Sequence, residues 1–357
     1  MLNYVVRRIL LMFPTVIGIT LVVFAVMWAS PGGVGGSLLS DAGAMQPEER
    51  KAREDYLNQR FGLNDPFIVQ YARWLNNVSP VGVKPVGTGF PGATRVGFKV
   101  PDLGRSFTRE RPVTDMIAEA LPVTLTLNLV TLPLVYGVAI SAGILTAAKR
   151  GSAFDVGTGV LLIALWSLPV MWVGVMLIGF LANRDYLPLF PIGGLNGPLA
   201  AGWTFFPSFK NGHPGWLLDR LWHLAAPIIC LTYGGFAFLS KLTRASMLEN
   251  MAADFVRTAR AKGQNERTIL FRHVLRNGVL PLITVASSIL PGLLGGSVIV
   301  EQIFSLNGMG KLTLEAIGVR DREVVLSMTL VISAISTVSL LIADLCYVAA
   351  DPRVSYE

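Results

Sequence analysis

The chain has 357 residues, of which 52% are hydrophobic and only 15% are charged, and its mean hydropathy is +0.55. Soluble domains carry about 25% charged residues, so the composition excludes an ordinary soluble protein and indicates an integral membrane protein. The net charge of +7 does not indicate nucleic-acid binding, because the basic residues gather beside apolar runs, where the positive-inside rule accounts for them.

The first apolar run covers residues 9–30 and is preceded by two arginines. A run of about 20 residues is too long for the core of a signal peptide, so we expect a retained membrane helix whose basic start lies in the cytoplasm. The polar stretch that follows, 31–115, is expected to form an external loop with an amphipathic helix at 47–60. Its segment 77–103 is rich in Gly, Pro and Val and is typical of a loop or short strands.

Five more apolar runs follow, and each is long enough to cross a bilayer as a helix. The short segments and ends that would lie inside carry thirteen Lys or Arg, against six in the two shorter external loops. The sequence therefore predicts an all-α membrane protein of six helices with both termini in the cytoplasm. The five runs cover 121–148, 156–182, 222–239, 279–300 and 324–350. We divide the chain into a first helix (1–30), the external loop (31–115), a five-helix core (116–350) and a tail (351–357).

A basic segment, 251–276, separates the fourth apolar run from the fifth. Between positions 241 and 276 there are eight Lys or Arg and three Asp or Glu, which is too polar a composition to cross a bilayer. Gly263 suits the left-handed conformation that ends a helix, and Asn265 can cap a second helix that has Glu266 in its first turn. We therefore expect a helix, a tight turn and a second helix at the membrane surface. Their apolar faces would consist of Phe255, Val256, Ala259, Ile269, Leu270, Val274 and Leu275.

The basic residues of this segment have two interpretations. Arg257, Arg260, Lys262 and Arg267 could form a solvated face directed at anionic lipid, or they could bind a partner protein. Attraction to lipid requires charge alone, whereas a glycine turn between two amphipathic helices indicates a shaped element. We therefore favour docking to a partner.

The apolar runs contain no ionisable residue near their middle, since Glu119, His223 and Asp344 all lie near the ends of runs. A carrier driven by an ion gradient usually needs such groups at the bilayer midplane, and an intramembrane protease would need paired catalytic groups there. The loop 305–313, SLNGMGKLT, lacks the first glycine and the hydroxyl residue of a phosphate-binding loop. The two cysteines indicate neither a disulfide nor a metal site. We expect a non-enzymatic chain without cofactor or metal, which receives its energy from a separate subunit.

The run VRTARAKG, followed by FRHVLRN and a proline, resembles the EAA loop of binding-protein-dependent ABC importers, in the form found in B-type oligopeptide and dipeptide permeases. The resemblance places Arg257, Thr258 and Ala259 on the E-A-A positions and makes Gly263 the loop glycine. Arg257 departs from the usual Glu, and the proline lies about a turn later than in sugar permeases. Both departures are usual in the peptide branch. In that family the loop forms coupling helices that contact the ATPase, which implies this role for Arg257, Thr258, Ala259, Arg260, Lys262, Gly263 and Arg267. Ala259 would let the first helix lie close to the ATPase.

A second motif, EQIFSLNGMG at 301–310, resembles the external signature after the fifth helix of these permeases. The resemblance makes Glu301, Asn307 and Gly308 candidates for an external gate, but a tight turn with a surface charge explains Glu301 and Gly308 equally well. Asn307 stands where most members have proline. Together with LWHLAAPI and the terminal DPRVSYE, this variant is most similar to the Yej-type subgroup, which is associated with oligopeptides and microcin C. The stretch 80–100 looks like an insertion without an assigned role.

The resemblance covers nearly the whole chain and implies a type I ABC importer permease fold in the bacterial inner membrane, with an extended external loop after the first helix. It also implies four kinds of partner: a second, homologous permease, two ATPase subunits that bind ATP and magnesium, an extracytoplasmic peptide-binding protein, and membrane lipid. A sister system for nickel or another small solute is an alternative, because selectivity in such systems lies largely in the binding protein. An ATP-independent carrier is a further alternative.

Overall fold

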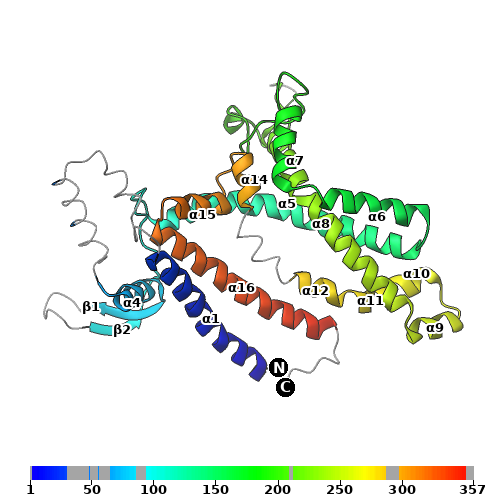
Figure 1. The fold of residues 1–357 in the computed structure, drawn as a ribbon, viewed down its shortest axis with the longest axis horizontal. Helices are drawn as coiled ribbons and strands as arrows, with labels where there is room; N and C mark the ends of the chain where they lie inside the picture. The colour runs from blue at the N-terminus through cyan, green and yellow to red at the C-terminus, as the bar shows by residue number, and fades with distance from the viewer. Residues whose placement is uncertain are drawn as a thin grey trace. The chain divides into compact units, whose positions relative to one another are not determined.

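The computed structural model of this chain describes residues 2–29, 48, 55, 65–85, 94–208, 212–286 and 297–350. The expected helix at 47–60 and the tail at 351–357 therefore lie outside the described residues, apart from positions 48 and 55. Helices make up most of the described chain, and the only sheet formed within those ranges is a short hairpin (Figure 1). The expected helical class is therefore confirmed.

Four helices are long and apolar enough to cross a membrane: α1 (Leu2–Ala29), α5 (Val113–Ala148), α8 (Trp216–Met251) and α16 (Arg322–Ala350). Two further candidates are bent pairs of helices, with bends of 87° and 49°. The first pair joins α6 (Ala153–Trp166) to α7 (Val170–Met176) and its π-helical continuation Leu177–Leu181. The second joins Glu266–Gly278 to α12 (Leu280–Ala286). By length and composition, the described part of the chain thus offers four spans, or up to six if each bent pair is one span.

The expected third span, 156–182, is interrupted by a sharp bend between Trp166 and Val170. Pro169 lacks an N–H group and disfavours the helical conformation at the residue before it, so α6 ends and α7 begins with Pro169 as its N-cap. The Tyr233 hydroxyl donates a hydrogen bond of 2.7 Å to the Leu168 carbonyl, which the break leaves without a helical partner. This bond helps to stabilise the bend.

The four long helices extend beyond the apolar runs in the sequence. Helix α8 extends from Trp216 to Met251, whereas the apolar run covers only 222–239. It begins after Gly215, whose φ of 82° is not helical, and it continues through Pro227 to its C-cap, Ala252. Polar residues with good helix propensity therefore extend α8 beyond its apolar part, directly into the basic segment.

The described residues form two compact units. One comprises Arg7–Glu119 and Leu312–Ala334, including α4 (Phe67–Val78) and most of α15 (Met309–Gly318). In the expected insertion, β1 (Val81–Pro85) pairs antiparallel with β2 (Thr94–Phe98), with Val81 opposite Phe98. The expected short strands are therefore confirmed. The core of this unit consists of Phe24, Tyr71, Trp74, Val78 and Leu326.

The other unit comprises Met1–Val6, Ala120–Lys311 and Ile335–Glu357. One of its cores gathers α7, α8 and α14 (Val298–Ile303) around buried side chains that include Leu127, Cys230 and Phe304. A second core lies where α5 ends and includes Ile144, Ala147 and, from α8, Met247. This second core supports the basic segment.

Candidate functional site

The basic segment folds as a helix, a tight turn and a second helix, as the sequence predicts. Helix α9 (Asp254–Ala261) ends at Gly263, whose φ of 77° is the left-handed conformation that glycine adopts without steric cost. The Asn265 side chain then accepts a hydrogen bond of 3.0 Å from the backbone N–H of Arg267 and caps the second helix. This helix begins as α10 (Glu266–Thr268), passes through a π-helical turn, Ile269–Val274, and ends as α11 (Leu275–Gly278). Figure 1 shows these elements gathered at the C-terminal end of α8.

One face of the segment packs on its own chain. The side chains of Val256, Ala259, Ile269 and Val274 are buried against the core formed by the end of α5 and by α8. Ala259 is only 6% exposed. Its small side chain lets α9 lie close to this core, and the expected approach of Ala259 to an ATPase stays a prediction. Phe255, expected on the apolar face, is 39% exposed.

The opposite face carries the basic side chains. Arg260 donates to Glu266 through Nε at 2.7 Å and through Nη2 at 3.2 Å, so one ion pair spans the glycine turn. Arg257 pairs with Asp254 at 3.3 Å within α9, and both side chains are largely exposed. Lys262 and Arg267 are exposed and form no ion pair with any described residue. The face therefore offers free positive charge beside a turn that the Arg260–Glu266 ion pair spans.

The second motif surrounds a buried carboxylate. Glu301 in α14 is fully buried, so the interpretation of this residue as a surface charge is wrong. Its Oε1 accepts hydrogen bonds from the Thr124 hydroxyl at 3.0 Å and the Ser297 N–H at 3.3 Å, and its Oε2 accepts one from the Lys311 N–H at 2.8 Å. The Gly310 N–H also donates to it. Burial raises the pKa of Glu301, and these four donors oppose the shift because they favour the charged form.

The glycines of this motif lie against the carboxyl group. A Cβ atom at Gly308 would lie 2.5 Å from Glu301 Cδ, which is closer than carbon atoms pack, so the loop can follow this path only with glycine there. Asn307 is exposed and accepts a hydrogen bond of 3.0 Å from Lys311 Nζ. Glu301 and Gly308 thus form one packed unit, and Asn307 lies on its surface.

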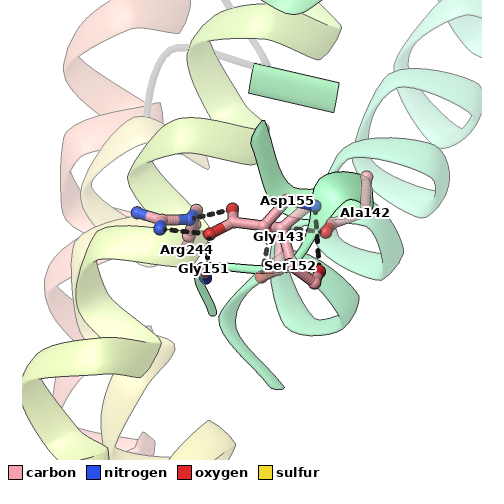
Figure 2. Close-up of polar contacts among 7 residues, drawn as sticks. Ala142, Gly143, Gly151, Ser152, Asp155 and Arg244 are labelled. Atoms are coloured by element: carbon pink, nitrogen blue, oxygen red, sulfur yellow. Dashed lines mark hydrogen bonds and ion pairs between the residues drawn. The ribbon is translucent and has the colours of Figure 1, made fainter. Parts of the chain in front are cut away.

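An ion pair between Asp155 and Arg244 was not predicted from the sequence. Arg244 of α8 donates through Nε to Oδ1 of Asp155 at 2.7 Å and through Nη2 to Oδ2 at 2.8 Å. Asp155 also accepts from the Gly151 N–H at 2.9 Å, and Ser152 caps α6 (Figure 2). The sequence contained a local signal, Gly-Ser-x-x-Asp at a helix start, but the partner lies 89 residues away.

Comparisons with known proteins agree with both motifs. A family model described as binding-protein-dependent transport system inner membrane component matches residues 139–356, and the model of the N-terminal part of such components matches residues 1–128. The chain belongs to this family. It is therefore a membrane component of a binding-protein-dependent transport system, and the resemblance seen in its sequence is confirmed.

Full-length relatives support the same assignment. The chain is 34% identical over 357 residues to the oligopeptide transport system permease protein AppB of Bacillus subtilis, with all of both chains covered. It is 31% identical over 363 residues to the dipeptide transport system permease protein DppB of Alkalihalophilus pseudofirmus, again with complete coverage. The inner membrane ABC transporter permease protein YejB of Escherichia coli O157:H7 is 30% identical over 375 residues, with 99% of each chain covered. The three identities differ too little to assign the chain to one subgroup of these permeases.

Proposed function

We propose that this chain is the permease subunit of an ATP-driven ABC importer for peptides and forms the translocation pathway with a second, homologous permease. The family membership and the full-length similarity to permeases named for oligopeptides and dipeptides support this function. Two ATPase subunits would bind ATP and magnesium, and an extracytoplasmic binding protein would deliver the peptide. The chain itself would carry out no covalent chemistry.

The main support for a coupling role comes from the segment Asp254–Arg276, which has one buried face and one exposed face. Its inner face packs against α5 and α8 through buried side chains, namely Val256, Ala259, Ile269 and Val274. Its outer face presents the exposed side chains of Lys262 and Arg267 on either side of the Gly263 turn. A push on the outer face would therefore move the ends of two long helices, as a coupling element requires. Arg257, Thr258 and Arg260 complete the proposed contact surface.

We assign the external gate to the loop held by Glu301. The carboxylate connects α14, Thr124 of α5 and the Gly308–Lys311 backbone through hydrogen bonds. A loop fixed in this way moves with α5 and does not fluctuate independently. The C-terminal end of α5 lies in the core that supports the basic segment. Helix α5 would therefore connect the proposed external gate to the proposed coupling segment.

The proposed topology places both termini and the basic segment in the cytoplasm of a bacterium, with six spans that include the two bent pairs. The basic residues near the ends of the spans support this orientation. Arg184 would then lie outside and Lys262 inside.

Co-purification of the chain with the products of its neighbouring operon genes tests the coupling role. We expect ATPase subunits to co-purify. The double variant Lys262→Glu, Arg267→Glu should reduce their recovery by at least about ten-fold, because its negative charges would repel the ATPase surface that the two basic side chains attract. These two residues are cleaner probes than Arg260, which has Glu266 as a partner. Arg184→Glu, an exposed charge in another loop, is the matched control and should retain the ATPase.

Gly263→Asp tests the geometry of the turn. We expect loss of peptide-stimulated ATP hydrolysis with normal membrane insertion, because an aspartate at a φ of 77° strains the turn and places a negative charge beside Arg260 and Lys262. Gly212→Asp introduces the same residue at a φ of 64°, in open space in another loop, and should leave hydrolysis unchanged. Normal peptide-stimulated hydrolysis in Gly263→Asp would overturn the coupling role.

A further inference from the structure

A pocket of about 350 Å³ lies between α6 and α8, beside the Asp155–Arg244 ion pair. This volume is within the range of about 300–1,000 Å³ that is typical of ligand sites. Its apolar wall is formed by Val156 and Leu162. Its polar side chains are Thr146, Asp155, Thr158, Ser240, Lys241 and Arg244. All of these residues belong to one compact unit of the chain.

The ion pair orients one side of the pocket. Arg244 uses Nε and Nη2 to bind the two carboxylate oxygens of Asp155, so its position is fixed from one edge of the guanidinium group (Figure 2). Its third nitrogen, Nη1, makes no hydrogen bond to any described residue. A planar guanidinium held along one edge presents its remaining N–H groups in a fixed direction.

Three more polar side chains of the pocket carry donors without a partner among the described residues, whereas the Thr146 hydroxyl is satisfied by the carbonyls of Ala142 and Gly143. Ser240 is only 2% exposed, yet its hydroxyl makes no hydrogen bond within the described chain. The same holds for the Thr158 hydroxyl and for the ammonium group of Lys241, which forms no ion pair with a described residue. Several donors without a described protein partner, gathered around one space, offer hydrogen bonds to a bound acceptor.

From this arrangement we infer that the pocket binds the phosphate group of an anionic phospholipid. The phosphate oxygens accept hydrogen bonds from Ser240, Thr158 and Arg244 and lie beside the charge of Lys241. The acyl chains follow the apolar wall onto α6, whose exposed side chains Val160 and Leu161 are apolar. Basic pockets between membrane helices commonly bind anionic headgroups. This inference requires only that the chain lies in a membrane and does not depend on the proposed coupling role.

Titration of the purified transporter with lipids, followed by native mass spectrometry, tests the inference. The full-length chain, extracted with its partners in a neutral detergent, is titrated with phosphatidylglycerol and with phosphatidylcholine of the same acyl chains. We expect one phosphatidylglycerol per chain to bind at least about five-fold more tightly than phosphatidylcholine, since one favourable charge near a headgroup contributes about that factor. Equal affinity for the two lipids would overturn the inference.

Two variants locate the bound lipid. Lys241→Ala should weaken phosphatidylglycerol binding by about five-fold and remove the preference for it, whereas Lys149→Ala should change binding by less than about two-fold. Lys149 lies in the turn between α5 and α6 but its ammonium group contacts the Phe154 ring and does not line the pocket. Gly159→Leu should also weaken binding, because Gly159 lines the pocket and the new side chain would take up space there; no atom lies within 4 Å of a Cβ at this position.

Competition with inorganic phosphate shows whether the pocket binds a lipid headgroup or a free phosphate ion. Millimolar phosphate should not displace the lipid, because the free ion does not use the apolar wall formed by Val156 and Leu162. Displacement by phosphate at these concentrations would indicate an anion site and overturn the assignment to lipid. Unchanged phosphatidylglycerol binding in both Lys241→Ala and Gly159→Leu would overturn the location.

Discussion

Glu301 is the residue on which the hydrogen bonds of the 301–310 motif converge. Its carboxylate accepts hydrogen bonds from the Thr124 hydroxyl and from the N–H groups of Ser297, Gly310 and Lys311. A carboxylate has only acceptor sites and therefore matches four donors, whereas a carboxamide turns one of its two ends into a donor. The four donors thus favour the charged form and oppose the burial that raises the pKa of Glu301.

Replacing Glu301 with glutamine should therefore destabilise the protein although the shape hardly changes. We expect the free energy of unfolding to fall by about 1–3 kcal/mol, because the new NH₂ group faces buried N–H donors. Glu315→Gln is the control: Glu315 pairs with Arg109 at 2.6 Å, but both side chains are about half exposed, so the loss should stay below about 1 kcal/mol. Thermal or denaturant unfolding of the purified proteins measures both. Equal losses would show that the Glu301 contacts are not specific for a carboxylate.

The neighbouring Gly308 depends on the same carboxyl group. In Gly308→Ala the new methyl group would lie 2.5 Å from Glu301 Cδ, so the loop must shift and the free energy of unfolding should fall by about 1–3 kcal/mol. Gly318→Ala, at the end of α15, has no atom within 4 Å of the added carbon and should be neutral or slightly stabilising. Unfolding midpoints measured in the same detergent compare the two. A loop that tolerates alanine at 308 would contradict the close packing described for this motif.

The two motifs differ in how much the sequence alone could predict at this scale. The left-handed Gly263 and the Asn265 cap were predicted correctly, because both depend on residues within one turn of the chain. The burial of Glu301 was not, because its partner Thr124 is 177 residues away. The burial of Ala259 could not be predicted either, because this residue packs against the end of α5, which is distant in the sequence.

At the scale of elements, the Asp155–Arg244 pair fixes the start of α6 to α8. Arg244→Ala should lower the melting temperature clearly, because it leaves the buried carboxylate of Asp155 with only its backbone partner and the end of its own helix. Arg257→Ala, which removes a pair whose side chains are largely exposed, should have almost no effect on melting. Arg244→Lys should recover only part of the loss, since an ammonium group cannot form the two parallel hydrogen bonds.

Equal melting temperatures for Arg244→Ala and Arg257→Ala would contradict this role of the pair.

Apolar runs predict which part of a helix crosses the membrane, but they do not predict where the helix ends. Helix α8 continues through Lys241 and Arg244 as far as Met251, and this extension brings Arg244 to Asp155. The break at Pro169 could have been predicted from the proline itself, whereas the hydrogen bond from Tyr233 to Leu168 could not.

At the scale of the whole molecule, the proposed topology predicts which positions react with an impermeant thiol reagent in intact cells. Cys346 is exposed and is first replaced by serine, whereas the buried Cys230 stays. In this background, Arg184→Cys should be labelled in intact cells, and Lys262→Cys only after the membrane is opened. Both positions are exposed to solvent, so accessibility alone does not separate them. Labelling of position 262 in intact cells would contradict the orientation.

Family membership and apolar runs were readable from the sequence because they depend on composition and local motifs spread along the whole chain. The proposed assembly adds that the segment Asp254–Arg276 transmits the work of a separate ATPase. Its inner face is already bound to α5 and α8, so only its outer face is available for that contact.

Site-specific photo-crosslinking in the assembled transporter tests this central claim most directly. A photoreactive amino acid is placed at Lys262 or Arg267 on the outer face, at Val256 on the buried face, and at Arg184 in another loop. We predict crosslinks to the ATPase chain from positions 262 and 267 and none from 256 or 184. Crosslinks to the ATPase from position 184, or their absence from both 262 and 267 in a complex that hydrolyses ATP in response to peptide, would contradict the account.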